Sequence, residues 1–120
     1  MSLARNIGDL PNGDDAPVFA CRAWINFNGT GTIAIRDSGN VTSITDNGTG
    51  DYTVTFATAM PDLNYAVCGA CGRDGSRTDN LNTTSISTDV YSTSSIRVLS
   101  VYEYQPEKRD SQFINVAIFR

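Results

Sequence analysis

At 120 residues the chain is long enough for one domain with a hydrophobic core and too short for two independently folded ones. The formal net charge is −4 and the nine Lys and Arg residues are scattered along the chain, which argues against a nucleic-acid-binding face. No apolar run approaches the roughly 18 residues that a membrane-spanning helix needs, so we expect no membrane insertion.

The composition favours β-structure. Apolar residues make up 40% of the chain and charged residues only 18%, so Thr, Ser, Asn and Gly must form most of the polar surface. β-branched Thr, Val and Ile are abundant, whereas the long charged residues that favour helices are few. We therefore expect an all-β fold.

The N-terminal stretch differs from the rest of the chain. Residues 1–16 contain Gly8, Pro11 and Gly13 among polar residues, which predicts a linker or extended arm that continues from an upstream segment. This stretch lacks the charged start and apolar middle of a signal peptide. Residues 17–120 are then expected to form the folded domain.

Period-two alternation between turn-forming clusters predicts seven or eight short strands in an antiparallel β-sandwich. Turns are expected at residues 28–31, 37–40 and 46–51, the last of which contains an Asn-Gly pair that supports positive φ angles. Short turns between successive strands also predict a β-meander at the start of the domain. The strands are expected at residues 18–27, 32–36, 41–45, 52–58, 65–72, 84–91, 95–104 and 112–119.

Several of these strands are apolar on both faces. The core face of the first strand is expected to carry Phe19, Cys21, Ala23, Ile25 and Phe27. The second face needs a cover, either a long loop or, as we favour, another copy of the same chain. The expected subunit contacts are Val18, Trp24, Val98, Phe113 and Phe119.

The residues available for chemistry argue against an enzyme. There is no histidine, and most of the thirteen Asp and Glu residues lie in turn sequences, so no catalytic residue is assigned. Cys68 and Cys71 have C-x-x-C spacing, but only Cys21 remains to complete a zinc site, so we expect no metal and no cofactor. Cys21 and Cys68 are interpreted as small core residues, although spacing alone leaves a disulfide open.

Four N-x-T sequences occur, at Asn28, Asn40, Asn47 and Asn82. Asn and Thr are residues that β-turns and strand edges select, so we interpret these sequences as turn chemistry rather than as glycosylation sites.

The longest polar loop, at residues 73–83, is the candidate binding region. Sugar recognition uses an aromatic ring for the apolar sugar face and planar polar groups for the hydroxyls. The alternative is that the tyrosines pack in the core or border an interface. The candidate glycan contacts are Arg73, Arg77, Asp79, Asn80, Tyr91 and Tyr102.

Residues 19–65 carry a family resemblance in several separate blocks. The blocks are CRAW at residues 21–24, NFNGT at 26–30, the DNGTGD turn within 43–53, AMP at 59–61 and NY at 64–65. Together they resemble C-terminal modules of tailed-bacteriophage tail fibre and tail proteins, marine viruses included. The second half of the domain resembles these modules only in its serine- and threonine-rich strands and its hydrophobic last strand.

The resemblance implies a homotrimeric β-sandwich at the distal end of a virion fibre. Such a module would bind a host surface glycan or protein, or cap the fibre trimer, and would be made in the host cytoplasm. The partners would be two further copies of the chain, the receptor and the upstream fibre segments. A free-standing lectin-like module is the alternative, and an enzyme that degrades polysaccharide at a site between subunits is a weaker one.

Overall fold

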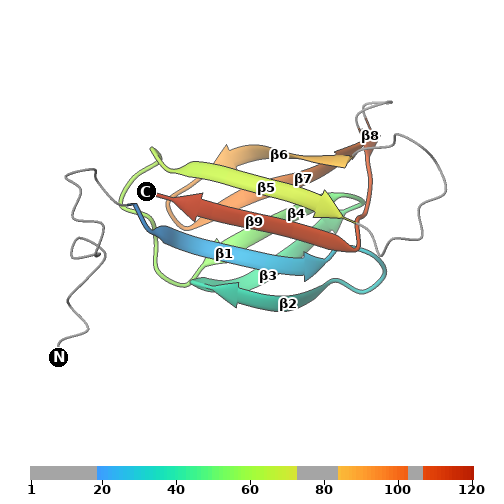
Figure 1. Ribbon diagram of the computed structural model, residues 1–120, viewed down its shortest axis with the longest axis horizontal. Coiled ribbons are helices and arrows are strands. Elements are labelled where there is room, and N and C mark those ends of the chain that lie inside the picture. The colour runs from blue at the N-terminus through green and yellow to red at the C-terminus, as the bar shows by residue number, and fades with distance from the viewer. Residues whose placement is uncertain (1–18, 73–83, 103–106) are drawn as a thin grey trace, which may run out of the picture.

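The computed structural model describes residues 19–72, 84–102 and 107–120 and contains nine strands within them (Figure 1). Among these residues there is no helix that could cross a membrane. Val18 and the expected N-terminal arm lie outside the described residues. The strands are β1 (Cys21–Asn28), β2 (Ala34–Gly39), β3 (Val41–Gly48), β4 (Asp51–Phe56), β5 (Ala66–Gly72), β6 (Thr84–Tyr91), β7 (Ser95–Tyr102), β8 (Glu107–Lys108) and β9 (Phe113–Phe119).

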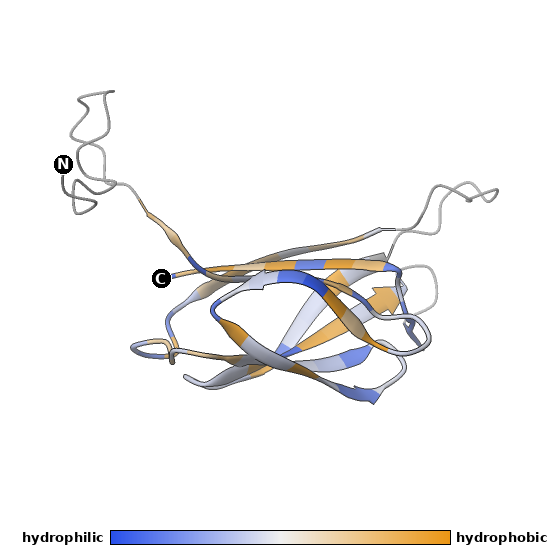
Figure 2. Ribbon diagram, turned by 90° about the horizontal axis from the view of Figure 1, so that it is seen from below, coloured by the Kyte–Doolittle hydropathy of each residue, from blue (hydrophilic) through white to orange (hydrophobic). Residues whose placement is uncertain are grey.

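Two antiparallel sheets pack against each other, which confirms the predicted β-sandwich. The front sheet, nearest the viewer in Figure 1, has the strand order β2-β1-β9-β5. The back sheet has the order β3-β4-β7-β6, with the short β8 paired to β7 beyond the point where β4 begins. Figure 2 shows the two layers one above the other.

The predicted β-meander is wrong, because the chain changes sheets between β2 and β3. Residues expected to form a turn at 37–39 belong to β2, and the change of sheet falls on Asn40, whose φ is 55°. The Asn40 Nδ2 group donates to the carbonyl oxygens of Arg22 and Thr58, both at 3.0 Å, and its Oδ1 accepts from Thr58 N at 2.7 Å. Asn tolerates this left-handed conformation, and its amide replaces the hydrogen bonds lost at the corner.

The core lies between the sheets and is built from alternate strand positions (Figure 2). Phe27 and Tyr52 are fully buried and meet edge to face, with ring centroids 5.0 Å apart. The other buried core residues are Ala23, Ile25, Val54, Phe56, Met60, Tyr65, Ile96, Val98, Ile114, Val116 and Ile118.

Three core-face assignments need correction. Phe19 is 73% exposed and Cys21 is also exposed, because the pairing of β1 with β9 shifts between Cys21 and Ala23 and only then settles into regular alternation. Val98, expected at the subunit contact, is fully buried beside Ile96 in the core, since alternate residues of β7 point inward from Ile96 onward. Val98 therefore cannot contact another subunit.

A group of polar contacts closes the end of the sandwich at which β1 and β3 finish. The Tyr52 hydroxyl lies 3.0 Å from Gly29 O and 2.8 Å from Asp110 Oδ1, and burial followed by the contact with Asp110 raises the pKa of Tyr52. A Cβ on Gly29 would lie 2.3 Å from the Tyr52 hydroxyl oxygen, so only glycine fits there. The Gly50 N–H also donates to Asp110. These contacts fix the DNGTGD turn to the segment before β9.

Candidate functional site: the outer face of the front sheet

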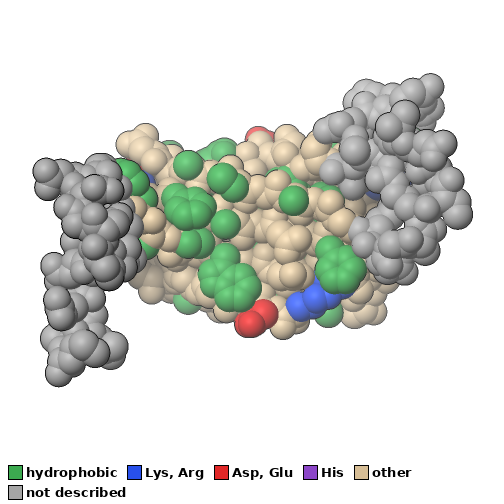
Figure 3. Space-filling model, in the orientation of Figure 1, with side chains coloured by type: hydrophobic (Ala, Val, Ile, Leu, Met, Phe, Trp, Pro, Cys, Tyr) green, Lys and Arg blue, Asp and Glu red, His purple; other side chains and the backbone are tan. Residues whose placement is uncertain are grey.

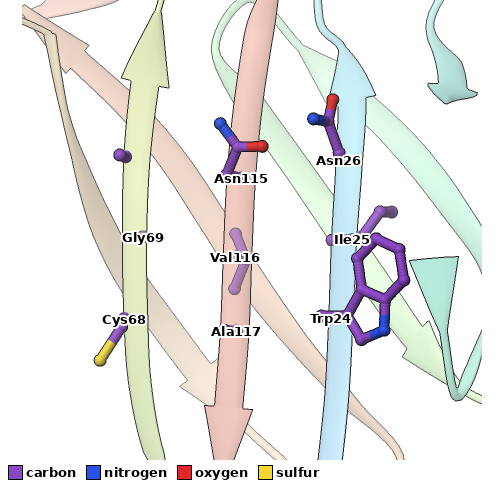
Figure 4. Close-up of a pocket in the computed structure, with 9 residues that line it drawn as sticks. Trp24, Ile25, Asn26, Cys68, Gly69, Asn115, Val116 and Ala117 are labelled. Atoms are coloured by element: carbon purple, nitrogen blue, oxygen red, sulfur yellow. The ribbon is translucent and has the colours of Figure 1, made fainter. Parts of the chain in front are cut away.

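The outer face of the front sheet presents the indole of Trp24 and several small apolar side chains to solvent. Strand register places Trp24, Ala117 and Cys68 in one row across β1, β9 and β5. The next row contains Asn26, Asn115 and Ala70. These six residues line a shallow depression of about 450 Å³ (Figure 4). Neither row contains a charged side chain.

Trp24 dominates this face. Its side chain is 41% exposed and lies against Gly39 of the neighbouring strand β2. A Cβ built on Gly39 would lie 2.3 Å from the indole nitrogen, so a larger residue there would displace the ring. The glycine thus allows the indole to pack on β2 while much of its surface still meets solvent.

Strand β2 brings two charged residues to the border of this face: Asp37, which is paired with Asn26, and Arg36. The guanidinium of Arg36 lies 4.0 Å from the ring centroid of Phe113, and its Nη1 donates to Asn26 Oδ1 at 3.2 Å. Arg36 therefore borders the face and holds the Asn26 amide in place. Figure 3 shows this side of the molecule, where hydrophobic side chains are spread over the front sheet and charged ones are few.

The structure brings three of the five predicted contact residues to this one face. Trp24 is exposed, and Phe113 and Phe119 are partly buried at outward positions of β9. Val18 lies outside the described residues, and Val98 is in the core. The sequence did not identify the small residues Cys68, Ala70 and Ala117, whose position becomes evident only from the strand register.

The candidate glycan contacts do not form one site among the described residues. Tyr102, at 5% exposure, is buried with the Arg109 guanidinium 4.0 Å from its ring centroid, so it cannot meet a sugar. Tyr91 is 40% exposed, but its ring packs on Tyr65 with centroids 5.2 Å apart. Arg73, Arg77, Asp79 and Asn80 lie outside the described residues.

Tyr91 is also remote from the strand ends that flank residues 73–83. It ends β6, whereas Thr84, the first described residue after that stretch, begins β6. An eight-residue strand spans about 23 Å between its first and last residues. The Tyr91 ring and the start of β6 are therefore on opposite ends of the sandwich.

Cys21, Cys68 and Cys71 form no disulfide with one another, and two of them are not core residues. Cys21 and Cys68 are exposed, contrary to expectation, while Cys71 points inward with its sulfur 3.4 Å from Ser100 Oγ. In the described ranges no cluster of His, Cys, Asp and Glu could hold a metal ion. Three of the four N-x-T asparagines use their side chains in hydrogen bonds: Asn28 and Asn47 locally, and Asn40 across the change of sheet.

The outer face of the back sheet carries a row of hydroxyl and charged side chains beside the apolar Leu99 and Val101. Strand register aligns Thr45, Thr53, Arg97 and Asp89 in one row across it. Beside this row Asp51, whose side chain is 4% exposed, accepts from Arg97 Nε and Lys108 Nζ, both at 2.8 Å. These donors, Arg97 foremost, hold the pKa of Asp51 well below its usual range despite the burial of the carboxyl group. The Asp51 carboxylate stays ionised, and its hydrogen bonds with Arg97 and Lys108 stabilise the fold.

The chain was also compared with known proteins. It matches no family model, no curated protein and no solved structure at a significant level. The surfaces of the sandwich and the sequence resemblance are therefore the features that bear on function.

Proposed function

We propose that this chain is a structural module that assembles into a homotrimer and forms the distal part of a virion tail fibre. In this role it contributes to binding of a host surface receptor or caps the fibre trimer, and it is made in the host cytoplasm. The observation that carries the proposal is the row Trp24, Ala117 and Cys68 on the outer face of the front sheet, which holds no charged residue and in which Trp24 is 41% exposed.

The composition of this face is that of an interface rather than of a solvated surface. Interface centres are enriched in aromatic residues and depleted in charged ones, and their polar rim carries the charges. Trp24, Phe113 and Phe119 lie on the face, and Arg36 lies at its border with its guanidinium stacked on Phe113. A second copy of the chain is the simplest cover for such a surface.

The residues of the sequence blocks have structural roles in the sandwich, and these roles support the fibre assignment. Gly29, Met60 and Tyr65 belong to these blocks and hold the sandwich together: Gly29 contacts Tyr52, Met60 is buried, and the Tyr65 hydroxyl donates to Ser92 O at 2.9 Å. Trp24 and Asn26 belong to the same blocks and lie on the outer face of the front sheet. The resemblance thus covers both the core of the module and the surface proposed to meet another copy.

Light scattering after size-exclusion chromatography tests the assembly. Three chains of 12.9 kDa give about 39 kDa, and we expect this mass for the unmodified protein at micromolar concentration. Ala117→Glu places a charge at the centre of the outer face and should yield a 12.9 kDa monomer. Thr55→Glu, the matched control on the back sheet, should leave the trimer intact. A monomeric unmodified protein would overturn the proposal.

A free-standing lectin-like module is the second candidate, favoured by one observation on the same face. The exposed indole of Trp24 lies near the side-chain amides of Asn26 and Asn115, which are paired across β1 and β9 (Figure 4). A ring beside planar amides suits a sugar. This candidate predicts a monomer that binds on a glycan array and loses that binding in Trp24→Ala.

A further inference from the structure

Strand β5 differs from the three other strands that end the two sheets. The edge strands are β2 and β5 in the front sheet and β3 and β6 in the back sheet. Sheet edges expose unpaired backbone groups, and proteins protect them with charged residues and with bulges that interrupt the flat edge. The four edges of this sandwich can be compared on both counts.

Three of the edges have both kinds of protection. β2 carries Arg36 and Asp37, β3 carries Asp46, and β6 carries Asp89. Each of the three also has a register shift in its pairing with the neighbouring strand. Such interruptions make an edge a poor template for another strand.

Strand β5 has neither protection. It pairs with β9 over seven successive residues without a register shift, and its sequence AVCGACG contains no charged residue. On the inner side, a Cβ on Gly69 would lie 3.0 Å from the Ile86 side chain, so β6 already packs closely against β5 there. The flat, uncharged surface of β5 is therefore its outer side.

This edge continues into the outer face of the front sheet. Ala66, Cys68 and Ala70 are exposed residues of β5, and Cys68 and Ala70 also end the two rows that begin at Trp24 and Asn26. Four strands of seven residues give the face a flat area of about 440 Å², little more than half of the roughly 800 Å² that each partner buries in a standard stable interface. The β5 edge adds a strip of about 23 Å by 10 Å, which brings the continuous surface to about 670 Å².

Symmetry limits how a second copy can cover both parts. A two-fold contact through the face leaves the β5 edge open, and a two-fold contact through the edge leaves the face open. A head-to-tail contact, in which the edge of one copy meets the face of the next, uses both surfaces on every copy. The outward directions of a sheet face and of the strand edge that adjoins it differ by roughly 60–90°. Head-to-tail contacts between two surfaces at such an angle close into rings of about three to four copies.

We infer that copies of this chain assemble head to tail, with the β5 edge of one copy packed on the outer face of the next copy's front sheet. The inference rests on the proposed trimer and states which two surfaces form its contact. The β5 edge and the two rows that begin at Trp24 and Asn26 and run across β1, β9 and β5 lack charged residues, and the charges of Arg36 and Asp37 lie on β2 at the far border of the face. A contact centred on these rows therefore buries no unpaired charge.

Disulfide cross-linking tests this contact. In a Cys21→Ser background, Asn26→Cys places a thiol on β1, and a second variant uses Arg22→Cys on the same strand. The native Cys68 is two strands away, about 9.6 Å, which exceeds the roughly 7 Å that a disulfide can bridge between Cα atoms within one copy. Under mild oxidation we expect covalent trimers on a non-reducing gel, and Cys68→Ser should abolish them.

The other outcomes have distinct meanings. Covalent dimers that persist in Cys68→Ser would indicate a two-fold contact through the face, and dimers that form without the added cysteine would indicate a two-fold contact through β5. Either result overturns the head-to-tail contact, as does a 39 kDa assembly that neither variant cross-links. A monomeric mass by light scattering overturns the proposed function itself.

Discussion

The two outer faces of this sandwich arise from the same alternation but end in different surfaces. On the back sheet, Thr45, Thr53, Arg97 and Asp89 form a row of hydroxyl and charged groups. On the front sheet, the row Trp24, Ala117 and Cys68 presents an indole, a methyl group and a thiol. Alternation decides which residues leave the core, whereas residue type decides whether water or another protein suits the surface.

The back sheet completes its own polar contacts. Arg97 pairs with Asp51 and also lies 3.5 Å from Asp89, and Lys108 of β8 reaches Asp51 as well. Across the described residues, every buried side-chain nitrogen or oxygen has a hydrogen-bond partner. Substitutions that separate stability from assembly should distinguish the two faces.

The largest expected difference is between apolar truncations on the two faces. Trp24→Ala removes the central aromatic residue of the proposed contact and should weaken each of the three contacts of the trimer about thirtyfold, as loss of an interface hot spot of about 2 kcal/mol does, which raises the overall trimer dissociation constant by about four orders of magnitude. Leu99→Ala, an apolar truncation on the outer face of the back sheet, should leave the constant unchanged. Sedimentation equilibrium measures both. Equal effects of the two substitutions would remove the distinction between the faces.

A smaller effect, on stability alone, is expected at Asp51. Asp51→Asn leaves Arg97 and Lys108 without their shared carboxylate and should lower the free energy of unfolding by roughly 1–2 kcal/mol. The loss is less than for a fully buried ion pair because both cations stay partly hydrated. Urea denaturation measures it, with the exposed Asp89→Asn as the control expected to change stability by less than about 0.5 kcal/mol. The assembled mass should not change in either variant.

The smallest effect concerns acid stability. The folded-state pKa of Asp51 is depressed, so the unfolded chain binds a proton first as the pH falls below about 4, and stability is lost from that point downward. The pKa of Asp62 is lowered to about 2, chiefly by hydrogen bonds from Arg120, and acts in the same direction. Thermal melts from pH 7 to pH 3 should therefore show a shallower decline for Asp51→Asn than for the unmodified protein. Parallel declines would mean that Asp51 ionises normally in the folded state.

Much of the fold could be predicted from the sequence because period-two alternation is a local property. The strand at residues 84–91 has the predicted bounds, and Ile25 and Phe27 are buried as expected. Two features were missed. The change of sheet at Asn40 resembles a hairpin turn in sequence, and β8 owes its two residues to pairing with Val101 and Tyr102 rather than to its own charged sequence.

The candidate site was predicted only in part, because a strand that is apolar on both faces does not reveal which face meets the core. In β7, Ile96 and Val98 alternate with Leu99 and Val101, and both sets are apolar. The choice depends on distant partners: Ser100 points inward and its hydroxyl lies 3.0 Å from Ser111 Oγ. Likewise, the role of Cys68 depends on its register with Trp24 across an intervening strand.

The Asn40 corner has a consequence for how the protein can be made. Both hydrogens of its Nδ2 group are used in bonds to the carbonyls of Arg22 and Thr58. An N-linked sugar on that nitrogen would replace one of these hydrogens and place its bulk at the junction between the sheets. A eukaryotic secretory host attaches sugars to Asn-x-Thr while the chain is still emerging. In such a host, glycosylation of Asn40 would compete with folding. In a bacterial cytoplasm the Asn40 amide stays unmodified and can form both hydrogen bonds.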